Sequence, residues 1–416
     1  MTHEAAAAAS SLLRPGDHLA GDLMSSAALL RAMLDVEQAW LDALVTAGVA
    51  PAAARVEVTS LAGAGDVATL AQAAVATGTP VSGLVALLRE RAESRGEVEA
   101  ARWLHRGLTS QDVVDTALVL CLREAAARIA RALDEQVASL AHLVRAHVST
   151  PMLGRTLTQA ATPTTFGLVA SGWLAAVLDA ADDLAAATRR GWPIQAGGAV
   201  GTSAALLELC AGERDRAAAV LAHAADALEL RLVTPWHTVR TPITRAGDAL
   251  VRCADAWGLL AGDVLLLGST DVGEVTEADG GGSSTMPHKS NPVRATLLRR
   301  LALTAPGLAS TLHVAAGQQA SQRAPGAWHA EAAVLADLAR QVAAGAELAT
   351  ALVGSLEIHP DVMRAHLDAT AGVDSEQRVM AGLVGRSPGG AEGYLGLAEH
   401  ACAQILDRAT APEVPS

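Results

Sequence analysis

No glycine and no proline interrupts residues 113–150, VVDTALVLCLREAAARIARALDEQVASLAHLVRAHVST. Apolar side chains recur along this stretch every three or four residues, as one face of an α-helix requires. A helix of this length extends on the order of 50 Å, at about 1.5 Å per residue. Such a length exceeds the diameter of a single compact domain, so the stretch predicts a bundle of long helices.

Four more helical stretches follow, at about Phe166–Arg190, Ile243–Leu267, Val293–Ala316 and Ala327–Val353. We therefore expect an all-α fold with a central long-helix bundle at 105–355, a small N-terminal helical domain at 1–104 and a small C-terminal helical domain at 356–416. Apolar residues cover much of the circumference of the long helices. Either association of several subunits or an inserted domain would cover this surface.

The composition supports helices and excludes several classes of function. Hydrophobic residues make up 51% of the chain but aromatic residues only 2%, so alanine and leucine, which favour helices, supply the difference. The net charge of −13 argues against a nucleic-acid surface, and no apolar run is long enough to span a bilayer.

The cysteines and the N-terminus bear on the compartment. Cys121, Cys210, Cys253 and Cys402 lack CxxC spacing, so we expect buried thiols and no disulfide frame. The N-terminus lacks the basic region of a secretory signal, and a cytoplasmic protein is expected. The histidines form no H-E-x-x-H pair, and no metal site is expected.

The chemistry is concentrated in a polar loop, Gly281-Gly282-Ser283-Ser284-Thr285-Met286-Pro287-His288-Lys289-Ser290-Asn291-Pro292. Nine of these twelve residues are small, hydroxylated or turn-forming, so neither a helix nor a strand is expected here. Asn291-Pro292 is typical of an N-cap followed by a proline at the first helical position. Because helix starts bind anions, we expect a substrate carboxylate there, beside Lys289. The alternative is a surface linker.

From Gly282 to Pro292 the loop fills every fixed position of the pattern G-S-S-x-M-P-x-K-x-N-P. It thereby resembles the signature loop of the fumarase/aspartase superfamily. Residues 105–117 and 154–163 are similar to the first and second signature regions of that superfamily. Residues 197–202, 235–240 and 326–331 look most like its 3-carboxy-cis,cis-muconate cycloisomerase branch, and with the tail at 367–372 the resemblance covers nearly the whole chain.

The resemblance implies a cofactor-independent enzyme that acts on a small polycarboxylate, as a homotetramer whose active sites are shared between subunits. It implies interconversion of 3-carboxy-cis,cis-muconate and 4-carboxymuconolactone through an aci-carboxylate intermediate, without a nucleic-acid or membrane partner. Two alternatives stay open. One is a C–N or C–O lyase of the superfamily that releases fumarate from a substituted succinate; the other is a catalytically silent helical scaffold.

The resemblance gives catalytic roles to Ser283, Lys289, His105 and His237. Ser283 would be the base that removes the proton α to a carboxylate, ionised beside Lys289. The alternative is that Ser283 and Ser284 only bond the loop backbone. His105 and His237 are candidate general acids near neutral pH. Each is otherwise a hydrogen-bonding partner in a packed interface.

The substrate-binding candidates are carried over in the same way, and most present donors to carboxylates. They are Thr109, Ser110, Gln111, Arg155, Thr156, Gln159, Arg240, Ser284, Met286, Asn291 and Arg323. Arginines suit this role because they bind carboxylates bidentately. The residues at 109–111 are equally suited to N-capping of a helix that begins near Val113, with Asp112 as another possible cap.

The chain departs from the family patterns at three places. Leu157 stands where lyases that act on argininosuccinate or adenylosuccinate have a histidine, which disfavours those two activities. Thr241-Pro242 follows Arg240 where the branch has Arg-Asp, and Ala320-Ser321-Gln322 precedes Arg323 where a Glu-His-Glu run is typical. These departures bear on the identity of the substrate more than on the type of reaction.

Overall fold

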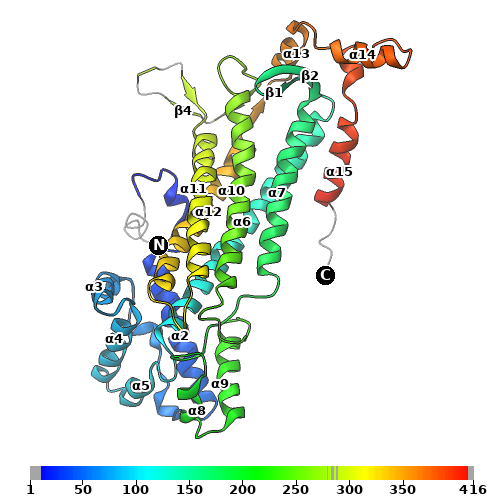
Figure 1. Ribbon diagram of the computed structural model, residues 1–416. Helices are drawn as coiled ribbons and strands as arrows, with labels where there is room; N and C mark the ends of the chain where they lie inside the picture. The colour runs from blue at the N-terminus through cyan, green and yellow to red at the C-terminus, as the bar shows by residue number, and fades with distance from the viewer. Residues whose placement is uncertain (1–10, 279, 283–284, 287–288, 411–416) are drawn as a thin grey trace. The chain divides into compact units, whose positions relative to one another are not determined.

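The computed structural model describes residues 11–278, 280–282, 285–286 and 289–410. Its fold class is all-α, as predicted, and five long helices dominate it (Figure 1). They are α6 (Ser110–His147), α7 (Phe166–Thr188), α10 (Thr241–Leu267), α11 (Val293–Gly317) and α12 (Ala327–Gly354). Their ends fall within three residues of the predicted ones, because glycines, prolines and polar loops interrupt the apolar periodicity there.

The chain forms two compact units. The first unit comprises Met1–Arg128, Leu184–Leu250 and Pro306–Ala343, and the second comprises Ile129–Asp183, Val251–Ala305 and Ala344–Ser416. Each of the five long helices contributes residues to both units. The three domains expected from the sequence, at 1–104, 105–355 and 356–416, stay a prediction.

The first unit also contains helices other than the five long ones. They are α2 (Ser26–Thr46), α3 (Val67–Thr77), α4 (Val81–Ser94), α5 (Val98–Trp103), α8 (Ala204–Leu209) and α9 (Arg214–Ala227), with the 3₁₀ turns η1 (Asp17–Ala20), η2 (Ala52–Ala54), η3 (Val58–Ser60) and η4 (Ala64–Asp66). Figure 1 shows α3, α4 and α5 grouped together, and α2 packs against α9. Helix α2 begins after Ser25, whose hydroxyl accepts the N–H of Ala28 at 3.0 Å.

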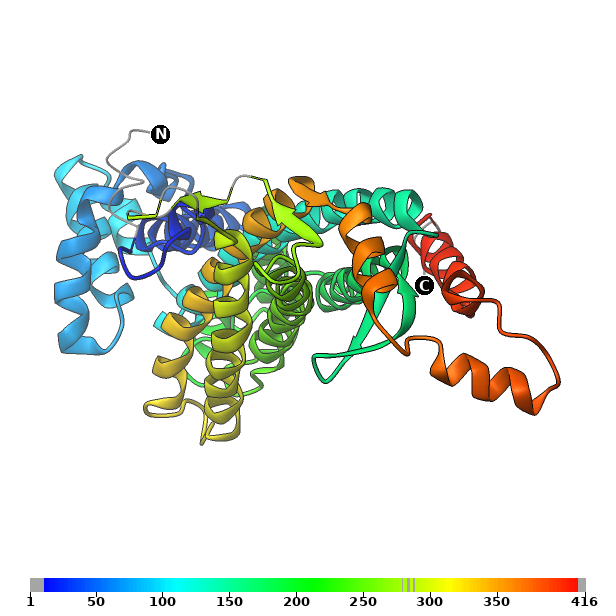
Figure 2. The same ribbon diagram turned by 90° about the horizontal axis from the view of Figure 1, so that it is seen from above.

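The second unit contains the strands and the C-terminal helices. The strands pair as β1 (Pro151–Thr156) with β2 (Gln159–Thr165), β3 (Val275–Glu277) with β6 (Leu356–Ile358), and β4 (Gly281–Gly282) with β5 (Ser290–Asn291), all antiparallel. The helices are α13 (Pro360–Ala369), α14 (Ser375–Leu383) and α15 (Ala398–Thr410), with the 3₁₀ turn η5 (Ala391–Tyr394). Figure 2 shows an irregular segment joining α14, in orange, to α15, in red.

Within the second unit, the long helices pack through small residues and through the buried amide of Gln136. Gln136 of α6 accepts from the indole N–H of Trp257 on α10 at 2.7 Å and donates to the carbonyl of Ala346 on α12 at 3.1 Å. A β-carbon on Gly258 of α10 would collide with that of Ala302 on α11. The alanine-rich composition therefore serves close approach of helices, with few aromatic side chains needed to fill the core.

Two further expectations can be compared with the described residues. All four cysteines are free and buried, as the sequence predicts. Within the described ranges, no helix combines the length and apolarity that a bilayer crossing requires.

Candidate active site

The first turn of α6 carries a buried carboxylate, Asp112, that accepts four N–H groups. They come from the backbone of Thr109 at 3.0 Å, from the backbone at 197–198 at 3.0 and 2.9 Å, and from Nε2 of His237 at 2.8 Å. Because an ionised carboxylate only accepts, this network assigns the hydrogen of His237 to Nε2. The other ring nitrogen, Nδ1, is turned toward Gly201.

Asp115 lies one turn further along α6 and forms a bidentate ion pair with Arg240. The two hydrogen bonds measure 2.7 and 2.9 Å. Glu331 of α12 lies 2.8 Å from Nε and 2.7 Å from Nη2 of the same guanidinium. The remaining Nη1 hydrogen faces the carbonyls of Trp236 and His237 at 3.4 and 3.5 Å. All five N–H groups of Arg240 therefore have acceptors within the chain.

This pairing changes the role that the sequence predicts for Arg240. Its guanidinium is 1% exposed, Asp115 0% and Glu331 2%. Burial opposes the charge on Arg240, yet the two carboxylates together raise its pKa. Burial also raises the pKa of Glu331, against the opposing effect of Arg240. With no donor left for a substrate carboxylate, we infer that Arg240 organises this part of the site.

Arg323 has donor capacity that Arg240 lacks. Its Nη2 donates to the hydroxyl of Thr109 at 2.6 Å and to the carbonyl of Ala199 at 3.4 Å. Its Nε is buried and has no hydrogen-bond partner among the described residues. Ser110, next to Thr109, is half-buried. Thr109, Ser110 and Arg323 thus lie together at the start of α6, and their role in binding a carboxylate stays a prediction.

Gln111 faces the interior instead. Its amide donates to Asp115 at 3.2 Å and to the carbonyl of His237 at 2.9 Å, and its side chain is fully buried. It therefore supports the Asp115 network rather than presenting a free donor. The helix starts at Ser110, three residues before the position expected from the sequence, with Asp112 bonding the N–H of Thr109 as in a capping box.

His105 stands in a strained backbone conformation in the first unit. Its φ is +64°, a left-handed value that costs a non-glycine residue about 1–2 kcal/mol. Its Nδ1 lies 2.6 Å from the carboxylate of Glu37 on α2. The sequence predicts His105 as a candidate acid but gives no sign of its partner.

Arg155 is also paired within the chain. In the second unit its guanidinium binds Glu274 with two bonds of 2.8 and 2.7 Å, and Nδ1 of His366 on α13 lies 2.8 Å from the same carboxylate. Glu274 is fully buried, so Arg155 neutralises it and anchors the β1–β2 hairpin. The predicted substrate contact of Arg155 is thus replaced by a structural one. Thr156 and Gln159 lie opposite each other near the exposed tip of this hairpin.

At the start of α11, backbone N–H groups bind the side-chain carboxylate of Glu277. Glu277 of β3 accepts the backbone N–H groups of Arg294 at 3.0 Å and Ala295 at 3.4 Å. The sequence predicts that the N–H groups at this helix start bind a substrate anion. That prediction is wrong for the N–H groups of Arg294 and Ala295, because Glu277 occupies them. Pro292 takes the N-cap position rather than the first helical one, since its carbonyl accepts from Thr296 at 3.0 Å.

Part of the signature loop borders a cavity in the second unit. A two-residue ladder joins 281–282 to 290–291, although no strand was expected, because glycine backbone can pair where a side chain would collide with Val293. Lys289 and Asn291 line the adjacent cavity of about 470 Å³. Met286 is exposed, and Ser283 and Ser284 lie outside the described residues.

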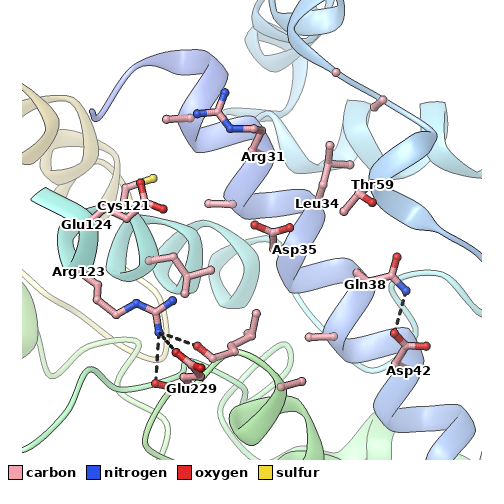
Figure 3. A pocket seen from close by; sticks show the side chains of 18 of the residues that line it. Arg31, Leu34, Asp35, Gln38, Asp42, Thr59, Cys121, Arg123, Glu124 and Glu229 are labelled. Carbon is pink, nitrogen blue, oxygen red and sulfur yellow. Dashed lines mark hydrogen bonds and ion pairs between the residues drawn. The ribbon is translucent and has the colours of Figure 1, made fainter. Parts of the chain in front are cut away.

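A different cavity, of about 710 Å³, lies among α2, α6 and residues 227–229 of the first unit (Figure 3). Its walls carry paired polar groups: Arg123 donates to the carbonyl of Leu228 at 2.8 Å, and Gln38 donates to Asp42 at 2.9 Å. None of the described residues that were predicted for the active site lines it.

The predicted residues thus fall into two groups. The first unit holds His105, Thr109, Ser110, Gln111, His237, Arg240 and Arg323; the second holds Arg155, Thr156, Gln159, Met286, Lys289 and Asn291. Sequence reasoning missed the acids that pair with these residues, Glu37, Asp115, Glu274 and Glu331, and it missed Glu277 at the start of α11; Asp112 was expected only as a helix cap. Asp115 and Glu331 lie within the segments that resemble the family, and an acid within an apolar helix is the signal that could have revealed them.

Comparison with known proteins gives matches along most of the chain. A family described as lyase matches residues 21–307. The nitrosuccinate lyase of Streptomyces davaonensis is 41% identical over 365 residues, which cover 86% of this chain and 76% of that protein. The 3-carboxy-cis,cis-muconate cycloisomerase of Bradyrhizobium diazoefficiens is 38% identical over 383 residues, covering 88% and 83%. The crystal structure of 3-carboxy-cis,cis-muconate lactonizing enzyme from Pseudomonas putida has a TM-score of 0.85 at 32% identity, covering 94% of this chain and 97% of that one.

Proposed function

Since the chain belongs to the lyase family of the fumarase/aspartase superfamily and is an enzyme of that superfamily, we propose that it interconverts 3-carboxy-cis,cis-muconate and 4-carboxymuconolactone. One observation carries this choice: the fold matches the lactonizing enzyme of Pseudomonas putida over 94% of the chain. The cycloisomerase of Bradyrhizobium diazoefficiens, at 38% identity, supports the same reading.

In the lactone-opening direction, Ser283 accepts the proton from the carbon α to a carboxylate. The electron pair passes into that carboxylate, giving an aci-carboxylate, and then forms the C=C bond as the lactone C–O bond breaks. Lys289 and Asn291, which line the cavity of the second unit, suit the neutralisation of this intermediate. Closure of the lactone follows the same steps in reverse.

The first unit supplies groups for a further carboxylate and for a proton. Thr109, Ser110 and Arg323 offer the carboxylate donors at the start of α6. His237 has Nδ1 available for proton transfer, because Asp112 holds its Nε2. The resemblance implies that a homotetramer assembles such groups, and sedimentation analysis of the purified protein tests that assembly.

A second candidate is elimination from a nitro-substituted succinate. It shares the first step, but the C–N bond breaks, so that nitrite leaves and fumarate forms. The nitrosuccinate lyase of Streptomyces davaonensis, at 41% identity, favours it. The changes at 241–242 and 320–322 favour it too, since they flank arginines that the cycloisomerase branch carries in other surroundings.

A panel assay separates these reactions. The purified protein is given carboxymuconate, its lactone and nitrosuccinate, and the loss of the conjugated diene, the formation of fumarate and the release of nitrite are followed. Lactone formation supports the first candidate, and fumarate with nitrite supports the second. No turnover of any substrate by the parent would count against both and favour the silent scaffold.

The role of Ser283 is tested by Ser283→Ala. We expect turnover to fall by about 10²-fold or more, because proton transfer is lost. Ser139→Ala is the matched control, since the hydroxyl of this half-buried residue bonds the carbonyl of Glu135 on α6, away from every described residue that was predicted for the site. Equal activity of the two variants would remove Ser283 from the mechanism.

A further inference from the structure

Helix α2 carries a buried carboxylate, Glu37, to which the proposed reaction gives no task. The side chain is 0% exposed, and its Oε1 lies 2.6 Å from Nδ1 of His105, whose ring is 16% exposed. Its Oε2 is buried and has no hydrogen-bond partner in the part of the chain that the structure describes. Burial of a charged acid is costly unless the acid is paired and hydrogen-bonded.

The same region fixes the backbone on both sides of His105. Trp40, nearly one turn after Glu37 on α2, donates its indole N–H to the carbonyl of Arg106 at 2.7 Å. Arg89 of α4 donates to the carbonyl of Leu104 at 2.8 Å. Bonds to Leu104 and Arg106 and the contact with Glu37 therefore hold the left-handed conformation of His105, and among the described residues Glu37 is the hydrogen-bonding partner of its ring.

Charged groups surround this contact. Arg89 interacts electrostatically with Glu37 and with Arg106. No other acid is seen to pair with the ring of His105 among the described residues. Glu37 is therefore the acidic partner of the His105 ring, and the Arg89 guanidinium is near enough to act on the same carboxylate.

We propose that Glu37 is a positioning residue, which fixes the hydrogen of His105 on Nδ1 and leaves Nε2 as the nitrogen that meets the substrate. A carboxylate only accepts, so Nδ1 must donate to it. This inference rests on the proposed function for the role that it gives to Nε2. The tautomer itself is a property of the folded protein and can be measured without substrate.

The test is ¹⁵N-histidine NMR on the parent and on Glu37→Gln, with turnover measured over a range of pH. In the parent we expect the Nδ1–H form of His105. In Glu37→Gln, where the amide can donate as well as accept, we expect Nε2–H to appear. Turnover should fall by about tenfold to a hundredfold, part of what acid–base catalysis contributes, with a displaced pH profile and a smaller change in KM.

Two further variants separate positioning from plain anchoring. Trp40→Phe removes the bond to the Arg106 carbonyl but keeps Glu37, so its Tm should fall while His105 stays in the Nδ1–H form. Glu37→Asp keeps an acceptor and should retain that form in part.

A parent His105 with its hydrogen on Nε2 overturns the inference, whether or not any variant folds. So does a Glu37→Gln protein whose tautomer, turnover and pH profile all match the parent. If the parent turns over no substrate while the tautomer changes as expected, the proposed function fails and the positioning contact stands.

Discussion

Replacement of Arg240 by methionine tests whether this arginine belongs to the protein's framework or to its substrate contacts. Methionine keeps much of the aliphatic stem, so the variant mainly loses the guanidinium and its bonds to Asp115 and Glu331. Breaking a buried pair by removing one partner costs about 3–5 kcal/mol. Here two buried carboxylates are left, so we expect the upper part of that range. Against a typical total of about 5–15 kcal/mol, this is a large loss.

The pH dependence of this loss has a definite sign. Burial already raises the pKa of Glu331 while Arg240 opposes the shift, so removal of Arg240 raises it further. A group whose pKa is raised on folding contributes stability below its unfolded pKa and loses it as pH rises through the folded one. Arg240→Met should therefore be destabilised more at about pH 8 than at about pH 5.

Urea unfolding monitored by far-UV circular dichroism measures the effect, with kcat and KM determined in parallel. Adding Glu331→Gln to Arg240→Met should recover roughly 1–2 kcal/mol, because one stranded charge disappears. Arg323→Met is the matched control: its guanidinium bonds Thr109 and a backbone carbonyl, so KM should rise with little change in stability. An unchanged urea midpoint with only a raised KM in Arg240→Met would refute the reasoning.

Three further predictions concern the rest of the fold. Arg155→Ala leaves Glu274 buried without its bidentate partner, so unfolding should become easier by about 3 kcal/mol or more and proteolysis of the β1–β2 hairpin faster. In denaturant titrations, Gly258→Ala should destabilise by about 1–3 kcal/mol, because the new methyl group meets α11, whereas Gly172→Ala, in open space on α7, should stabilise by roughly 0.5–1 kcal/mol. Burial raises the pKa of Cys253 to about 12, so a thiol reagent at about pH 8 should label it only after unfolding. The stability linked to this raised pKa is present below about pH 9 and is lost as pH rises toward the folded value.

The long helices could be predicted because their signals are local. Apolar periodicity and breaker residues are properties of neighbouring positions, and they place α6 and α10 to within three residues. The β1–β2 hairpin was missed because Gln159–Thr165 lacks an apolar alternation. Strand β1 also contacts α13, more than 190 residues away, and no local pattern encodes such a contact.

For the candidate site too, the sequence predicts some features and leaves out those that depend on distant contacts. The family pattern predicts Arg155 and Arg240 as arginines that pair with carboxylates, but it cannot say which carboxylate each one binds. Asp115 lies 125 positions from Arg240, and Glu274 lies 119 positions from Arg155. Pairings over such separations depend on the folded arrangement, so only the three-dimensional structure distinguishes the arginines that keep free donors from those that do not.

The internally satisfied guanidinium of Arg240 has a consequence for how such a protein diversifies. Because its hydrogen bonds are directed inward, the segments on either side can exchange side chains without stranding a charge. Replacements such as Thr241-Pro242 then change the side chains next to Arg240 while its pairs with Asp115 and Glu331 stay intact. A framework whose buried charges are paired internally allows close relatives to evolve toward different substrates with little loss of folding stability.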